Sequence, residues 1–197
     1  AIGDNANRVV LNAYKDALYN YRDPRWRIEH AQVIHPDDYE LFNEKIIPSV
    51  QPTHATSDMY WLYDRVGKNR GKYSYAWGDL LKQSGTIAFG TDFPVEKINP
   101  IMTFYSAVFR KDVEGFPEEG FQIENGVNRA DALLGMTYFG AHANFEENEK
   151  GSIQKGKFAD FIILDTDLIK DAENKVKNAK VAATFLNGDL VFSRRFN

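Results

Sequence analysis

Two histidines and one aspartate in this sequence have the side chains and positions that metal-assisted hydrolysis needs. His30, His54 and Asp92 each stand shortly after a run of strand-forming residues. Imidazole nitrogens and carboxylate oxygens together suit Zn²⁺, Mn²⁺ or Fe²⁺. A bound metal lowers the pKa of a water molecule to about 7, and a nearby Asp can pass the released proton to a leaving group. The three residues together therefore predict a divalent metal site.

Each of these residues also has a plainer explanation when it is taken alone. A lone histidine at a strand end is more often a structural group, and a lone aspartate after a strand is more often a turn or cap residue. His35, before a proline that can begin a helix, and His142, near a helix C-terminus, fit such structural positions. The metal hypothesis therefore depends on whether the fold brings the three residues together.

Three predicted strands position these side chains. We expect strands at residues 26–30, 46–51 and 86–89, and helices at residues 4–21, 36–44, 57–66, 77–83, 101–108 and 129–140. Alternation of strand and helix is typical of βα units with a parallel sheet. An α/β barrel presents its functional groups at the carboxyl ends of such strands, and all three predicted strands lead to a polar residue at that end.

The pattern changes after residue 145. Short strands are expected at residues 151–153, 160–164, 181–186 and 190–192, and the dipeptide Asn187-Gly188 predicts a type I′ hairpin turn between the last two. The chain is therefore expected to divide into a strand–helix unit over residues 1–145 and a small β-domain over residues 146–197.

Composition excludes several classes of function. The 197 residues carry a formal net charge of -4, which opposes a nucleic-acid-binding surface, and no apolar run is long enough to cross a membrane. The absence of cysteine excludes disulfides, thiolate metal sites and cysteine nucleophiles. The basic segment at residues 67–72 is one residue short of a phosphate-binding loop, and Tyr73 stands where Ser or Thr is needed. The cellular compartment is left open.

Four segments of the chain resemble a known family. They are residues 27–32 (RIEHAQ), 51–58 (QPTHATSD) and 90–96 (GTDFPVE), and the tail at residues 151–161, with its Gly-Ser-Ile, Gly-Lys and Ala-Asp-Phe elements. In this order they are similar to the metal-dependent amidohydrolase superfamily, and most similar to the branch that includes the N-substituted formamide deformylases. The resemblance covers nearly the whole chain.

The resemblance implies both a fold and site roles. The implied fold is α/β, the C-terminal part of a (β/α)8 TIM-like barrel followed by part of a small β-sandwich. His30 is carried over as a metal ligand at the end of barrel strand six, and Asp92 as the strand-eight ligand and catalytic proton shuttle. His54 falls at the end of strand seven, where the family places substrate-contacting groups. The implied cofactor is a divalent metal, with zinc first and manganese or iron as alternatives.

The chain also departs from the family pattern. The family's His-x-His pair on strand one and its bridging carboxylate or carboxylated lysine on strand four are missing, and the opening Ala1-Ile2-Gly3-Asp4 begins one residue after a strand-five ligand. We therefore expect a C-terminal fragment that holds metal weakly or not at all, since a catalytic zinc site uses about three protein ligands. Exposed strand edges predict association with a second copy, with the missing N-terminal half, or by domain swapping.

The sequence therefore predicts a metal-dependent hydrolase of C–N bonds in small amide, formamide or cyclic amide substrates, inactive as this fragment alone. The alternative is a non-catalytic folded fragment or pseudoenzyme with a structural or interaction role. Neither nucleic acid nor a membrane is expected as a partner.

Overall fold

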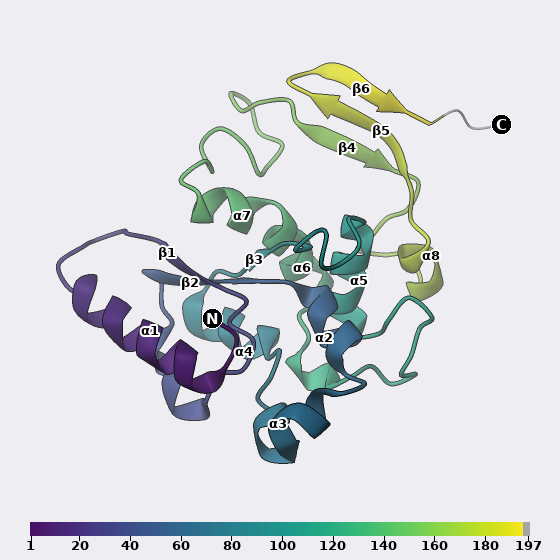
Figure 1. Ribbon diagram of the computed structural model, residues 1–197. Helices are drawn as coiled ribbons and strands as arrows, with labels where there is room; N and C mark the ends of the chain where they lie inside the picture. Colours follow the sequence, from purple (N-terminus) through teal and green to yellow (C-terminus); the bar gives the residue numbers. More distant parts are fainter. Residues whose placement is uncertain (195–197) are drawn as a thin grey trace.

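The computed structural model describes residues 1–194 (Figure 1). The strands are β1 (Trp26–Glu29), β2 (Ile46–Val50), β3 (Ala88–Phe89), β4 (Phe161–Leu164), β5 (Val181–Leu186) and β6 (Asp189–Ser193). The α-helices are α1 (Asp4–Ala17), α2 (Pro52–Asp58), α3 (Leu62–Gly71), α4 (Trp77–Ser84), α5 (Pro100–Phe109), α6 (Arg129–Met136), α7 (Tyr138–Ala143) and α8 (Glu173–Lys177). Two 3₁₀ helices are η1 (Pro36–Leu41) and η2 (Ile123–Asn125).

The first three strands form a parallel sheet in the order β1-β2-β3. Glu29 pairs with Ser49, and Ser49 pairs with Ala88, so the three strands end at one edge of the sheet. Backbone hydrogen bonds between the strands continue beyond the ends of β1 and β3. The N–H of His30 donates to Ser49 O at 2.8 Å, and the N–H of Gly90 donates to Val50 O at 3.0 Å. The predicted alternation of strand and helix, and the shared edge, are confirmed.

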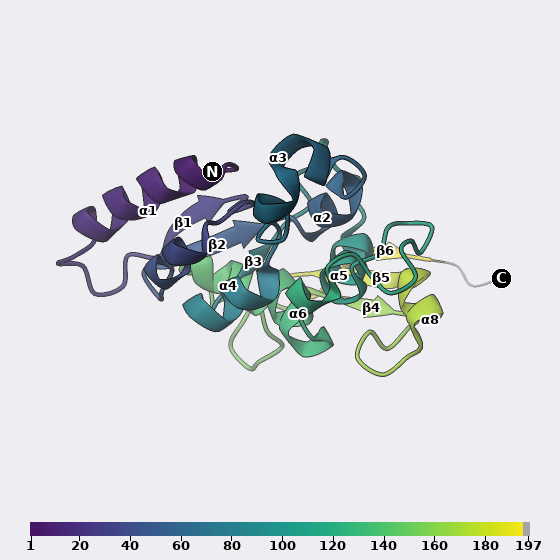
Figure 2. The ribbon, with the colours of Figure 1, turned by 90° about the horizontal axis from the view of Figure 1, so that it is seen from below.

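The central strand β2 is buried on both faces, as expected for a parallel sheet covered by helices. Ile46 belongs to the main hydrophobic core, which includes Leu80 of α4. Ile47, on the other face, packs with Ala88 of β3 and Ala143 of α7 in a second cluster. Figure 2 shows α1 and α4 beside this sheet, and both helices contribute to the core that contains Ile46.

The last three strands form a separate antiparallel sheet in the order β4-β5-β6. Asn187 and Gly188 connect β5 to β6 with φ angles of 50° and 86°, so both residues have the positive φ of a type I′ turn. This prediction is confirmed. In Figure 1 the sheet stands apart from the parallel strands, with α7 between them.

Polar contacts join the tail to the strand–helix unit. Glu173 of α8 accepts from the hydroxyl of Tyr105 at 2.8 Å and from Lys111 at 3.0 Å. Arg25 donates to Glu147 at 2.8 Å and lies over the ring of Phe145. These ion pairs hold the two parts together at two separate points along the chain.

The prediction of one helix at residues 57–66 is wrong in its bounds. Helix α2 begins at Pro52, directly after β2, because proline is well suited to the first position of a helix. A second helix, α3, begins at Leu62 and continues through most of the basic segment at residues 67–72, with Gly67 forming a kink at φ 74°. The strand before His54 therefore turns into a helix without an intervening loop.

Three other expectations need correction. The helix predicted at residues 129–140 is two helices, α6 and α7, which are separated at Thr137 with φ -130° and ψ -88°. Residues 151–153 form no strand, although strands β4, β5 and β6 match the others predicted in the tail. The helix predicted at residues 36–44 is the shorter 3₁₀ helix η1. Over residues 1–194, no helix combines the length and the apolar character needed to cross a bilayer.

Candidate metal centre

His30 follows β1 in an unusual backbone conformation. Its φ is 71° and that of Ala31 is 42°, so the chain turns sharply as it leaves the strand. Within residues 1–194 the Nδ1 atom of His30 is buried and has no hydrogen-bond partner. A buried polar atom without a partner needs an explanation, and a bound ion is one of the standard explanations.

His54 and Asp92 reach the same edge of the sheet from neighbouring elements. His54 lies in the first turn of α2, and its side chain is 10% exposed. Asp92 stands three residues after the end of β3 with a φ of 57°, and its side chain is 36% exposed. His54 is therefore held inside the protein, whereas Asp92 faces the solvent.

The structure brings all three predicted residues together. One ligand atom from each of His30, His54 and Asp92 can be chosen so that all of these atoms lie within 4.8 Å of one another. The two imidazole rings stack with centroids 5.8 Å apart at an interplanar angle of 18°, and His54 Nε2 lies 3.4 Å from Asp92 Oδ2. Two nitrogens and one oxygen form a donor set that suits zinc and similar ions, so the residues fit a divalent metal.

Glu96 is a member of the site to which the sequence pattern assigns no role. Its Oε1 lies 2.9 Å from His54 Nδ1 and accepts from the hydroxyl of Ser57 at 2.6 Å. Ser57 lies one turn after His54 in α2, and Glu96 lies four residues after Asp92. Both residues belong to the segments that resemble the family, but only the folded chain pairs them.

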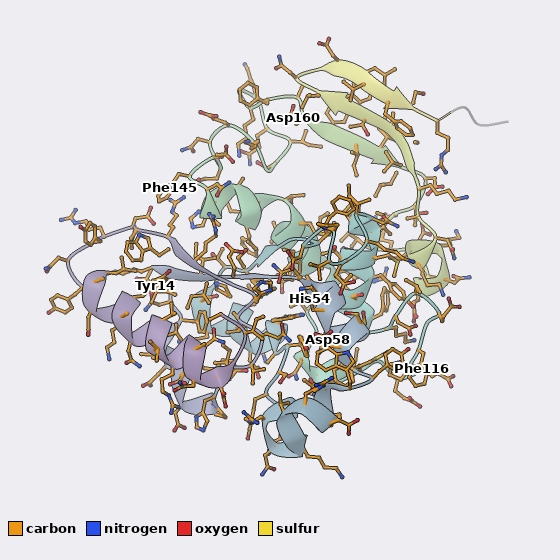
Figure 3. The ribbon with its side chains drawn as sticks, viewed as in Figure 1. Tyr14, His54, Asp58, Phe116, Phe145 and Asp160 are labelled. Carbon is orange, nitrogen blue, oxygen red and sulfur yellow. The ribbon has the colours of Figure 1, made fainter. Side chains whose placement is uncertain are left out.

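A third carboxylate near His54, that of Asp58, belongs to a polar network with buried members. Asp58 lies one turn beyond His54 on α2 (Figure 3), and its Oδ2 accepts from the Tyr75 hydroxyl at 2.6 Å. Gln32, two residues after His30, donates to the Tyr75 hydroxyl at 2.7 Å. Burial raises the pKa of Asp58, although the hydrogen bond from Tyr75 and the nearby His54 act in the opposite direction.

The backbone of Tyr75 also makes hydrogen bonds to this network. Its N–H donates to Gln32 O at 2.8 Å, and its carbonyl accepts from Nη1 of Arg110 at 3.1 Å. Arg110 is fully buried, also donates to Phe121 O, and has its pKa lowered by burial to about 10. Burial also raises the pKa of Tyr75, so its hydroxyl stays a proton donor to Asp58. This network therefore connects the end of β1 to α2.

The other two histidines occupy the structural positions expected for them. His35 precedes η1, where its Nδ1 accepts from the N–H of Asp37 at 3.3 Å. His142 lies in the last turn of α7, 3.6 Å from Glu147. Neither residue belongs to the cluster of His30, His54 and Asp92.

Comparison with known proteins gives consistent matches. The model of the amidohydrolase family matches residues 1–192 of the chain. Protein LONG AFTER FAR-RED 3 of Arabidopsis thaliana is 35% identical over 196 residues, covering 98% of this chain and 33% of that protein. N-substituted formamide deformylase of Arthrobacter pascens is 30% identical over 115 residues, covering 58% of this chain and 21% of that protein.

A solved structure agrees with these matches. An uncharacterised metal-dependent hydrolase from Pyrococcus horikoshii superimposes with a TM-score of 0.73 and 33% sequence identity, covering 88% of this chain and 34% of that one. The chain spans about a third of the length of this structure and of the Arabidopsis relative.

Proposed function

Because the chain belongs to the amidohydrolase family, we propose that His30, His54 and Asp92 serve a metal-dependent hydrolase that cleaves a C–N bond. The substrate class is a small amide, formamide or cyclic amide, and water is the nucleophile. The observation that carries this proposal is the convergence of three ligand atoms within 4.8 Å at the carboxyl ends of parallel strands. The similarity to N-substituted formamide deformylase supports the choice of bond.

The roles of the three residues follow from their donors and exposure. His30 and Asp92 would hold the ion, with zinc as the first choice and manganese or iron as alternatives. The family resemblance implies substrate contact for His54. Since its Nε2 lies 3.4 Å from Asp92 Oδ2, we assign it to the ligand set instead. The chemistry that such an ion supplies is Lewis-acid activation of water and of a carbonyl group.

Asp92 is also the group best placed to move a proton. Its side chain is 36% exposed, so a substrate and a water molecule can reach it, whereas His54 is largely covered. A carboxylate has two oxygens, so one can hold the ion while the other takes a proton from the attacking water. The same oxygen would then hand this proton to the leaving nitrogen.

The same proposal includes an assignment of the two parts of the fold. We assign residues 1–145 to the C-terminal part of a (β/α)8 barrel and residues 146–197 to part of a small β-sandwich. The parallel sheet β1-β2-β3 in the first part and the separate antiparallel sheet β4-β5-β6 in the second support this assignment. Since the chain spans about a third of the solved relative, hydrolysis is expected to need further protein segments, so that these 197 residues alone are inactive. Those segments, or a second copy, are the expected partners.

Metal content tests this proposal. The chain is purified without a chelator or a His tag, dialysed against Zn²⁺ and then against buffer, and analysed for elements. Because His54 adds a third ligand to the two that the resemblance implies, we now expect near-stoichiometric zinc in place of weak binding. This zinc should be lost in His30→Ala and Asp92→Ala and retained in His35→Ala, a matched control outside the cluster. A folded chain that holds no more zinc than its His30→Ala variant would contradict the proposal and favour a non-catalytic role.

A further inference from the structure

The two ring nitrogens of His54 have different carboxylate neighbours. Nδ1 lies 2.9 Å from Glu96 Oε1 in a hydrogen bond, whereas Nε2 lies 3.4 Å from Asp92 Oδ2. The first distance is typical of an N–H···O hydrogen bond and the second lies beyond the usual range. The proton of a neutral ring therefore belongs on Nδ1, where it has an acceptor.

Glu96 is itself held in place from two sides. The hydroxyl of Ser57 donates to Oε1 at 2.6 Å, and the side chain of Glu96 is only 17% exposed. The backbone N–H groups of Val95 and Glu96 both donate to the carbonyl of Asp92, at 2.7 and 3.4 Å. One tight turn therefore carries both carboxylates that face His54, and a residue of α2 fixes the orientation of Glu96.

From this geometry we propose that Glu96 is a positioning residue for the metal centre. It accepts the Nδ1–H of His54 and so leaves the lone pair on Nε2, the nitrogen that faces Asp92. A neutral imidazole has one N–H and one lone pair, and the hydrogen bond made by one nitrogen decides which nitrogen can ligate. The role that we assign to Glu96 rests on the proposed function, whereas the hydrogen bond between Glu96 and His54 is observed independently of that function.

The rival arrangement is an ion pair with a purely structural role. A doubly protonated His54 would donate to both Glu96 and Asp92 and would have no lone pair for a metal. The two arrangements differ in the number of protons on one ring, which nitrogen chemical shifts report directly.

The test is ¹⁵N NMR of histidine-labelled, metal-free protein from pH 6 to pH 10, with His54→Ala used to assign the ring signals. Wherever the His54 ring is neutral, we expect its proton on Nδ1 in the unmodified chain and a mixture of the two tautomers in Glu96→Ala. The matched control is Glu119→Ala, which removes an exposed glutamate and should leave the tautomer unchanged. Zn²⁺ affinity, measured by calorimetry, should fall about 10- to 100-fold in Glu96→Ala alone, as it does when outer-shell partners of ligands are removed.

Three results would overturn the inference: a proton on Nε2 in the unmodified chain, a ring that stays doubly protonated across the whole range, or a Glu96→Ala protein with an unchanged tautomer. If Glu96→Ala fails to fold, the tautomer of the unmodified chain still decides between the two arrangements. A chain that binds no zinc but shows the Nδ1–H tautomer would contradict the proposed function and leave this positioning role standing.

Discussion

At the scale of single residues, the candidate site is built where the backbone departs from regular strand geometry. His30 and Asp92 have φ angles of 71° and 57°, a region that few residues other than glycine enter. Such conformations cost on the order of 1–3 kcal/mol each and persist only where the surrounding structure enforces them. Here backbone hydrogen bonds hold these conformations: His30 donates to Ser49 of the parallel sheet, and the carbonyl of Asp92 accepts from the turn that follows it. Both side chains therefore reach the same cluster of ligand atoms.

Asp58 is expected to lower the stability of the fold at neutral pH. Burial raises its folded pKa above that of an unfolded aspartate, which is about 3.9. When the pH falls through the raised pKa, the folded state takes up the proton first, so the cost of the buried charge disappears. Asp58→Asn keeps a carbonyl oxygen to accept from Tyr75, and it should therefore be more stable than the unmodified chain at pH 7.

Urea unfolding at a series of pH values measures this effect. The gain in unfolding free energy from Asp58→Asn should be largest near pH 7 and shrink as the pH falls toward about 3.9. Asp79→Asn, which removes an exposed carboxylate, is the control and should show a much smaller change. A gain that does not vary with pH, or a variant less stable than the unmodified chain at pH 7, would contradict the burial argument.

At the scale of elements, the first turn of α2 matters most for the site. Proline at the first helical position lets the chain pass from β2 into a helix within one residue, Gln51. His54 and Asp58 are four residues apart on this helix and so share one face, while Ser57 lies one turn after His54 and reaches Glu96. One short helix therefore contributes to the metal cluster, to the Glu96 contact and to the Tyr75 network.

The hairpin between β5 and β6 offers a test of turn chemistry. Gly188→Ala should destabilise the chain by about 1 kcal/mol, because its φ of 86° is costly for any residue with a Cβ. Steric crowding is not the cause, since the added methyl group would meet only Ala159 at 3.8 Å. Chemical denaturation of the variant measures the loss.

The matched control for this substitution is Gly90→Ala. Gly90 lies outside the left-handed region, and an added Cβ there meets no atom within 4 Å. It should lose much less stability than Gly188→Ala does. Equal losses in the two variants would show that the positive φ of the turn is not what requires glycine.

At the scale of the whole molecule, the antiparallel sheet leaves apolar side chains uncovered on both faces. Phe161, Phe185 and Leu190 follow one another across the strands, with the two phenyl rings stacked at 4.6 Å. Leu190 is 57% exposed and Phe192, on the opposite face, is 46% exposed. Because β6 is also an edge strand, this sheet is prone to pair with another chain.

We therefore expect the chain to self-associate through this sheet. Light scattering after size-exclusion chromatography should give a mass above the 22.5 kDa of one chain, increasing with concentration. Phe192→Glu should shift the equilibrium toward the monomer, whereas Tyr19→Glu, a matched change at an exposed residue of the other part, should not. A single monomeric species at all concentrations would contradict this expectation.

Sequence reasoning located six of the seven predicted strands, the polar ends of the first three and the family, because each of these depends on contiguous residues. It placed His54 in a non-helical segment after a strand, whereas His54 lies in the first turn of α2. Pro52 was a helix-start signal that could have indicated this helix. It assigned no role to Glu96 or to Asp58. No local pattern marks Glu96, because its partner His54 lies 42 residues away.

The sequence by itself therefore determined which residues are capable of the chemistry and which strand ends carry them. Alternation of apolar and polar residues, prolines and glycines at turns, and short motifs are properties of neighbouring positions. Only the tertiary structure decided that three donor atoms meet within 4.8 Å, that Glu96 faces Nδ1 of His54, and that the buried Tyr75 donates to Asp58. The physical reason is that distances, burial and pKa shifts arise from packing between segments far apart in the chain, which local spacing does not specify.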